Sequence, residues 1–275
     1  MAIFLGDNIM NTNRIDKIFK INKNILTLYL TSGYPDKDKS KDIANALINS
    51  NIDILEIGIP FSDPIADGPT IQNTSFKAIN AINEPIVDFT FEIVSELRKK
   101  DTNKPIIIMS YLNLIFQYGI ERFAQNASTY GIDAIVIPDL PYDESLNIKK
   151  SLETHNIYLI YMVTPTSSPK TINEISQNAK GFIYYVSSTG VTGSRETLSE
   201  ENFKNINEIR KYTEIPILIG FGISSKKHLD IIKPWANGAI VASALINQIN
   251  DLLTDYNVKN VENTINNFVN ELRGK

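Results

Sequence analysis

Eight short runs rich in Ile, Leu and Val recur along the whole chain, and their spacing constrains the fold more than any other feature of the sequence. Stretches with helical spacing of apolar residues separate them, at 38–50, 86–100, 118–131 and 198–212. This alternation is typical of βαβ units and a parallel sheet. The apolar runs cover residues 25–30, 52–59, 105–111, 133–138, 157–163, 181–187, 216–221 and 238–243.

The number of repeats and the chain length favour a closed barrel. Parallel strands are usually buried on both faces, which explains why these runs are almost continuously apolar. Eight βα repeats in 275 residues predict an α/β protein with one (β/α)8 TIM-barrel domain over residues 1–275, with additional helical segments near 13–22 and 261–275. A doubly wound open sheet is the alternative, but no strand is followed by GxGxxG and a helix.

Composition narrows the possible partners. The net charge is −4, and no dense run of Lys or Arg indicates a nucleic-acid or membrane surface, so we expect small molecules or proteins as partners. The chain has no Cys, and its two histidines lie far apart, which argues against a metal site. The N-terminal stretch lacks the pattern of a signal peptide, and the apolar runs are too short to span a membrane. We therefore expect a cytoplasmic protein.

An acidic residue stands inside one of the predicted strands. In LEIGI (55–59), strand alternation puts Leu55 and Ile57 on one face and Glu56 on the other. We expect the bulky face to meet the helices and Glu56 to point into the barrel, where Gly58 leaves space for a substrate. The eight runs contain no Lys or Arg to neutralise this acid, so burial should raise the pKa of Glu56 towards the range useful for acid–base catalysis.

Two more acids follow in the loop PFSDPIADGP (60–69). Its prolines restrict the backbone and would hold Asp63 and Asp67 in position, although an ordinary surface turn also accounts for Asp63. In a (β/α)8 barrel the active site is built where strands end and βα loops begin. Glu56 and Asp67 are therefore candidate functional residues.

The whole segment LEIGIPFSDPIADGPTIQ (55–72) resembles the signature of the tryptophan synthase α subunit family. Further stretches resemble that family in order, among them YLTSGYPD (29–36), IVIPDLPYDES (135–145), GFIYYVSSTGVTGSR (181–195) and PILIGFGIS (216–224), so the resemblance covers roughly the whole chain. It implies a TIM-barrel lyase that cleaves indole-3-glycerol phosphate to indole and glyceraldehyde 3-phosphate. The reaction is a retro-aldol cleavage that needs no metal or organic cofactor.

The resemblance also implies roles for individual residues. Glu56 and Asp67 match the catalytic glutamate and aspartate of the family, and Tyr184 matches an active-site tyrosine. A buried Glu56 suits proton transfer, whereas an ionised Asp67 could accept a hydrogen bond from the indole N–H group. Tyr184 should point inward, in a supporting role, but a core aromatic is the structural alternative.

Further positions are candidates for substrate binding. Tyr29, Tyr111 and Phe221 could shape the indole pocket, although each could equally fill the barrel. Small residues at three strand–loop junctions could hold a phosphate through backbone N–H groups. These phosphate candidates are Gly193, Gly222, Ala242 and Ser243.

Two positions depart from the common family pattern. Ala242 stands where Gly is usual, a change that should be tolerated if its φ is not positive. Ser188 stands where some members have Arg, in a segment, 187–197, that we interpret as a lid. The resemblance implies that Thr192 of this segment hydrogen-bonds near Asp67 when the lid is closed.

Family members act with a pyridoxal-phosphate β subunit that receives the indole, and the resemblance makes Asp63 and Asp139 the candidate contacts with it. Several alternatives stay open. The chain could be a stand-alone lyase, another phosphate-binding barrel enzyme, or a non-catalytic barrel that binds a phosphorylated ligand and activates a β subunit. A Schiff-base aldolase is disfavoured because the strand runs contain no Lys.

Overall fold

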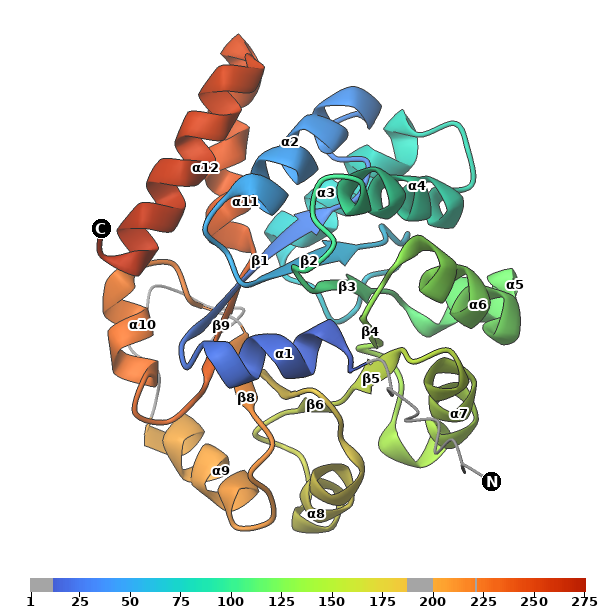
Figure 1. Ribbon diagram of the computed structural model, residues 1–275, viewed down its shortest axis with the longest axis vertical. Coiled ribbons are helices and arrows are strands. Elements are labelled where there is room, and N and C mark those ends of the chain that lie inside the picture. The colour runs from blue at the N-terminus through green and yellow to red at the C-terminus, as the bar shows by residue number, and fades with distance from the viewer. Residues whose placement is uncertain (1–11, 187–199, 221) are drawn as a thin grey trace, which may run out of the picture.

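The computed structural model describes residues 12–186, 200–220 and 222–275, and in this part of the chain all strands pair in parallel in one sheet (Figure 1). The sheet order is β5-β4-β3-β2-β1-β9-β8-β7-β6. The strands are β1 (Ile25–Thr31), β2 (Ile54–Gly58), β3 (Ile106–Met109), β4 (Ala134–Val136), β5 (Tyr158–Ile160), β6 (Met162–Val163), β7 (Ile183–Val186), β8 (Ile217–Gly220) and β9 (Gly238–Val241).

The nine strands correspond to the eight predicted runs. The run 157–163 is divided into β5 and β6, and only Tyr161 lies between them. Because β5 and β6 are also the two ends of the sheet order, this continuous stretch of chain brings the ends of the sheet together. The prediction of a (β/α)8 barrel is confirmed.

Helices surround the sheet on the outside, as Figure 1 shows. The predicted helices at 38–50, 86–100, 118–131 and 198–212 and the two terminal segments are all present. The helices are α1 (Arg14–Ile21), α2 (Lys37–Asn49), α3 (Pro69–Ala81), α4 (Ile86–Arg98), α5 (Leu112–Tyr118), α6 (Ile120–Tyr130), α7 (Leu146–Thr154), α8 (Pro169–Asn178), α9 (Glu200–Arg210), α10 (Lys226–Ile232), α11 (Ser243–Leu252) and α12 (Val258–Arg273), with short 3-10 turns η1 (Tyr142–Glu144) and η2 (Leu253–Asp255).

Strand alternation separates two apolar clusters. Leu55 and Ile57 belong to the outer cluster between strands and helices, as predicted, whereas Ile54 belongs to the cluster inside the barrel. Inward residues of other strands, such as Ile107 and Leu218, complete the inner cluster. The interior is therefore a packed core, and a substrate can enter only at an end of the barrel.

The helix α1 closes the end of the barrel where the strands begin. Asn13 caps it by accepting a hydrogen bond from the Ile15 N–H group at 2.9 Å. Ile15 is buried in the inner cluster, and Ile18 and Phe19 pack against that cluster. Figure 1 shows α1 lying across the barrel. The carboxyl ends of the strands are thus the end that is left for a site.

No helix within the described ranges is both long and apolar enough to cross a membrane.

Candidate active site

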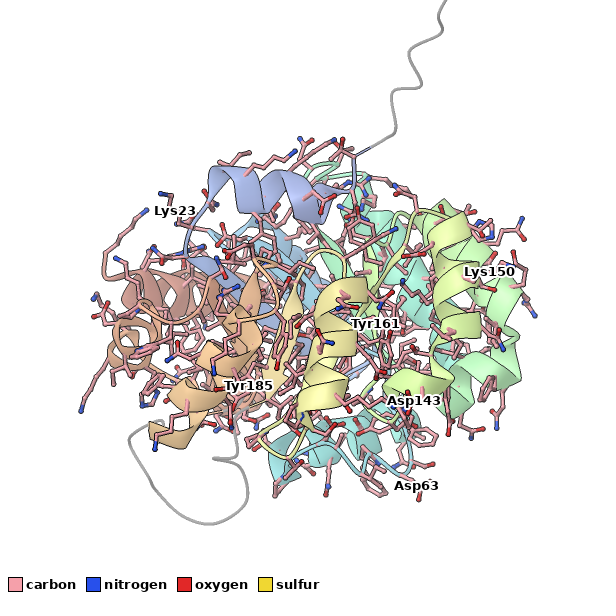
Figure 2. The ribbon with its side chains drawn as sticks, turned by 90° about the horizontal axis from the view of Figure 1, so that it is seen from below. Lys23, Asp63, Asp143, Lys150, Tyr161 and Tyr185 are labelled. Carbon is pink, nitrogen blue, oxygen red and sulfur yellow. The ribbon has the colours of Figure 1, made fainter. Side chains whose placement is uncertain are left out.

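The predicted catalytic residues come together at the carboxyl ends of the strands. Glu56 lies on β2, Tyr184 on β7, and Asp67 in the loop between β2 and α3. The charges of Glu56 and Asp67 both contribute to raising the pKa of Tyr184, after the larger effect of burial, so the three side chains share one electrostatic environment. The neighbouring Asp63 lies at the end of the barrel remote from α1 (Figure 2).

Glu56 is a buried acid that no described residue pairs with. Its side chain is 0% exposed, and within the described residues neither carboxyl oxygen has a hydrogen-bond partner. Burial, with a further contribution from the charge of Asp67, raises the pKa of Glu56 to about 8. A carboxyl group in this state holds its proton at neutral pH and can both give and take one.

Asp67 lies in a loop that is held by its own hydrogen bonds. The Asp67 N–H group donates to the Pro64 carbonyl at 3.1 Å, and Gln72 Nε2 donates to the Asp67 carbonyl at 2.9 Å. Gly68 and Pro69 then begin α3, where the fixed φ of proline suits the first helical position. The rigid loop predicted from its prolines is therefore anchored directly to α3.

Tyr111, which follows β3, reaches across to Asp67. Its hydroxyl donates to Asp67 Oδ2 at 3.1 Å and accepts from the Ala66 N–H group at 3.0 Å, and its ring stacks on Phe61 at 5.0 Å. Burial raises the pKa of Asp67 to about 6, and the hydrogen bond from Tyr111 acts in the opposite direction. The sequence offered Tyr111 as a residue that could shape the indole pocket or fill the barrel, and it contains no local signal for the hydrogen bond to Asp67.

Tyr29 fills the space beside Gly58. A methyl group built on Gly58 would lie 2.0 Å from the Tyr29 hydroxyl oxygen, so the phenol of Tyr29 occupies the volume that a side chain would need. The space beside Gly58 was expected to hold the substrate, and this expectation was wrong because the phenol of Tyr29 fills that space. Register explains this: Thr31 of β1, two residues beyond Tyr29, pairs with Gly58, so the phenol leans along β1 onto the end of β2.

Tyr184 is seated in the same way on the other side of the barrel. A methyl group on Gly220 would lie 2.4 Å from a ring carbon of Tyr184, and the register pairs Gly220 with Val186, two residues beyond Tyr184. Tyr184 points inward with Phe182, as predicted. Two tyrosines thus lie against glycines at strand ends. The register between neighbouring strands creates both contacts, so the sequence alone does not reveal them.

The described phosphate candidates lie at neighbouring strand ends. Gly222 follows β8 with a φ of +74°, and Ser243 is the first residue of α11, directly after β9. Ala242 caps that helix with a φ of −121°, which meets the condition for replacing Gly. No side chain caps α11, so its first N–H groups have no side-chain partner within the described structure.

Four predicted positions lie outside the described residues: Thr192, Gly193, Phe221 and the variant position Ser188. The two predicted partner contacts are described. Asp63 is exposed and accepts a hydrogen bond from the Ser62 hydroxyl at 2.5 Å. Asp139 is half-buried and accepts from the Leu112 N–H group at 2.9 Å, at the start of α5.

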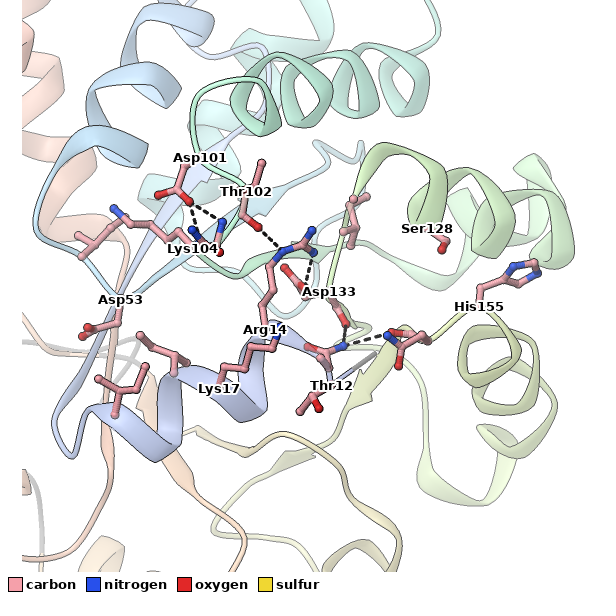
Figure 3. Close-up of a pocket in the computed structure, with 18 residues that line it drawn as sticks. Thr12, Arg14, Lys17, Asp53, Asp101, Thr102, Lys104, Ser128, Asp133 and His155 are labelled. Carbon is pink, nitrogen blue, oxygen red and sulfur yellow. Dashed lines mark hydrogen bonds and ion pairs between the residues drawn. The ribbon is translucent and has the colours of Figure 1, made fainter. Parts of the chain in front are cut away.

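A cavity of about 940 Å³ lies at the opposite end of the barrel, beneath α1 (Figure 3). Its two buried acids, Asp53 and Asp133, already have charged partners. Asp133 accepts from Arg14 at 2.8 Å, from Arg98 at 2.7 Å and from the Ile106 N–H group at 2.8 Å. Asp53 accepts from Arg273 Nη2 at 2.6 Å. These pairs attach α1 and α12 to the barrel, so we assign them a structural role.

No group of three or more His, Asp or Glu side chains that could hold a metal ion occurs in the described part of the chain.

Known proteins that are similar to this chain are tryptophan synthase alpha chains, the family that the site residues indicate. The family model described as "Tryptophan synthase alpha chain" matches residues 15–273. The tryptophan synthase alpha chain of Alkaliphilus metalliredigens is 41% identical over 244 residues, which cover 89% of this chain and 90% of the relative. That of a Thermoanaerobacter species is 40% identical over 266 residues, covering 95% and 98%.

Solved structures show the same fold. The tryptophan synthase subunit alpha of Legionella pneumophila has a TM-score of 0.84 and 31% identity, covering 96% of this chain and 100% of that one. A chain of the tryptophan synthase α2β2 complex of Pyrococcus furiosus has a TM-score of 0.83 and 29% identity, covering 92% and 99%. The chain described here therefore belongs to the tryptophan synthase alpha chain family.

Proposed function

We propose that this chain is a lyase of tryptophan biosynthesis that cleaves indole-3-glycerol phosphate to indole and glyceraldehyde 3-phosphate. The observation that carries the proposal is the buried carboxyl group of Glu56, which has no hydrogen-bond partner among the described residues and shares its environment with Asp67 at the open end of the barrel. A carboxyl group that is costly to bury is retained where its chemistry is used.

The retro-aldol reaction moves one proton onto carbon and removes another from oxygen. Glu56, protonated at neutral pH, donates its proton to C3 of the indole ring and then accepts the proton of the hydroxyl group beside the ring. The bond between C3 and the side-chain carbon breaks, its electron pair returns to the ring, and the O–H electron pair forms the aldehyde carbonyl. The proton count is balanced, so one acid suffices for both transfers.

Asp67 stabilises the positive charge that develops on the indole nitrogen. Its Oδ2 accepts the hydrogen bond of Tyr111, which leaves Oδ1 for the ring N–H group. Tyr111 also holds the loop backbone at Ala66 and thereby fixes the carboxylate. Asp67 carries the negative charge and Glu56 the proton, because the pKa of Asp67 is raised to about 6 and that of Glu56 to about 8.

The phosphate of the substrate binds on the side of β8 and β9. Gly222 and the N-terminus of α11, at Ala242 and Ser243, would provide backbone N–H groups and the positive end of a helix dipole. The expected contribution of Gly193 belongs to the same site. Tyr184 points inward from β7, the neighbour of β8, and feels the charges of Glu56 and Asp67, so its ring would support the ligand.

A β subunit is the proposed partner, as in the α2β2 complex of the Pyrococcus furiosus protein. Exposed apolar side chains beside the site support this. Ile65 is 82% exposed in the loop that carries Asp63, and Phe116 is 54% exposed on α5, whose first turn is held by Asp139. We assign Asp63 and Asp139 to the partner-facing side. The proposal includes a cytoplasmic location, because a phosphate ester does not cross a membrane unaided.

The deciding experiment measures glyceraldehyde 3-phosphate release from indole-3-glycerol phosphate by the purified chain, with and without a β subunit. Glu56→Gln should reduce turnover by roughly 100-fold or more while ligand affinity is kept. Glu144→Gln, which changes an exposed acid on η1, is the matched control and should leave turnover unchanged.

The outcomes separate the alternatives. Release that rises strongly with the β subunit supports the coupled lyase, and high release by the chain alone indicates a stand-alone lyase. Binding without release in either mixture would mean a non-catalytic barrel. Unchanged turnover in Glu56→Gln would refute the assigned mechanism.

A further inference from the structure

The hydroxyl group of Tyr29 has no role in the mechanism above, although it lies inside the site. Tyr29 is 3% exposed, and its ring is fixed against the backbone of Gly58, at the carboxyl end of the strand that carries Glu56. Burial raises the pKa of Tyr29 well above its ordinary value, and the charges of Asp67 and Glu56 raise it further. The phenol is therefore a permanent hydrogen-bond donor near both acids.

The described residues form only a weak hydrogen bond with the Tyr29 hydroxyl. Its one hydrogen bond within the described residues comes from Thr31 Oγ1 at 3.4 Å, which is long. Thr31 Oγ1 also lies 2.7 Å from Thr74 Oγ1, and the Thr74 hydroxyl donates to the Ile71 carbonyl at 2.8 Å. The single Thr31 proton is therefore needed for Thr74 at the shorter distance. The Tyr29 oxygen is weakly held, and its proton has no acceptor in the described structure.

A buried donor without an acceptor is normally avoided, so a ligand atom is its natural partner. The indole N–H group is itself a donor and cannot accept. The phosphate oxygens are assigned to the side of β8 and β9, whereas Tyr29 leans from β1 onto β2. The two hydroxyls of the glycerol chain remain as acceptors. The one next to the indole ring becomes the aldehyde oxygen and gives its proton to Glu56, so it is the hydroxyl that must lie close to Glu56 and hence to Tyr29.

We propose that Tyr29 is a further catalytic residue, whose phenol donates a hydrogen bond to the substrate oxygen that becomes the aldehyde carbonyl. This inference rests on the proposed lyase function. As Glu56 takes the proton from that oxygen, negative charge builds on it, and a fixed donor in a dry site stabilises the charge most at the transition state. Tyr29 keeps its own proton throughout, so the reaction balance is unchanged.

The test combines one protein substitution with one change in the ligand. Tyr29→Phe removes the hydroxyl and keeps the ring against Gly58, so the fold is retained. It should lower kcat/KM on indole-3-glycerol phosphate by roughly 10- to 100-fold, mostly in kcat. The Kd of an analogue in which hydrogen replaces only the hydroxyl next to the ring should change less than about twofold, since this ligand lacks the acceptor.

Tyr161→Phe is the matched control. This tyrosine packs in the outer cluster, and its hydroxyl contacts Ser145 at 3.0 Å, so the substitution should leave both measurements unchanged. Circular dichroism of all variants checks that the fold is intact.

A second analogue, in which hydrogen replaces only the middle hydroxyl of the glycerol chain, is measured in the same way. Three results would overturn the assignment: an unchanged kcat/KM, a loss of affinity for the first analogue equal to the loss in kcat/KM, or an affinity that is insensitive to Tyr29→Phe for the second analogue alone. An equal loss would mean that the phenol only shapes the pocket. If the unaltered chain neither binds the analogue nor cleaves the substrate, the proposed function itself has failed, and this result is distinct from the other three.

Discussion

Replacement of Glu56 by Gln should remove a loss of stability that the wild-type protein shows as the pH rises, while it lowers turnover by roughly 100-fold or more. The wild-type carboxyl group is 0% exposed and without a hydrogen-bond partner among the described residues, so ionising it in the folded state is unfavourable. Its pKa is raised from an ordinary 4.5 to about 8. Below pH 4.5 both folded and unfolded chains hold the proton, and this group then contributes no pH dependence.

Between pH 4.5 and 8 the unfolded chain releases the proton and the folded chain keeps it, so the wild type loses stability through this window and no further above it. Linkage gives a loss of about 1 kcal/mol at pH 5, about 3 kcal/mol at pH 7 and about 5 kcal/mol at pH 9. Gln cannot ionise and avoids this loss. Its buried amide adds a destabilisation that does not depend on pH. The test is therefore how the difference in free energy of unfolding between Glu56→Gln and the wild type changes with pH.

Urea unfolding of both proteins at these three pH values, followed by circular dichroism, measures the difference. The free energy of unfolding of Glu56→Gln minus that of the wild type should increase with pH and level off above 8. The variant Glu144→Gln should give a difference that stays level across the same range, because this acid is exposed. Parallel curves for Glu56→Gln and wild type would refute the assignment of a desolvated, protonated Glu56.

Two further predictions test the surroundings of the site and the opposite end of the barrel. Tyr111→Phe removes the hydrogen bond to Asp67 and should therefore raise the pKa of that carboxyl above its value of about 6. The acid limb of the pH profile of kcat/KM should then move up by about one pH unit. An unmoved limb would show that Tyr111 does not hold Asp67 ionised. Asp133→Asn leaves Arg98 without its buried charged partner and should lower the free energy of unfolding in urea by about 3 kcal/mol. The value of kcat should be retained. A loss of stability below about 1 kcal/mol would contradict the structural role of this pair.

Local patterns were sufficient for much of this description. The alternation of apolar runs and amphipathic stretches predicted the βα repeats, because strand and helix periodicities are properties of short segments. The inward direction of Glu56 followed from strand alternation within β2, and the motif around Asp67 identified the family. The division of the run 157–163 at Tyr161 was not predicted, since a continuous apolar run contains no local signal for it.

The amino-acid sequence by itself thus determined the barrel, the family and the two acids, because each depends on residues that are neighbours in the chain. The tertiary structure decided what surrounds those acids. Tyr29 covers Gly58 through the register of β1 with β2, and Tyr111 reaches Asp67 from the loop after β3. These contacts depend on how segments far apart in the chain are aligned, and alignment between strands is fixed by packing and hydrogen bonding of the whole sheet, which no single segment encodes.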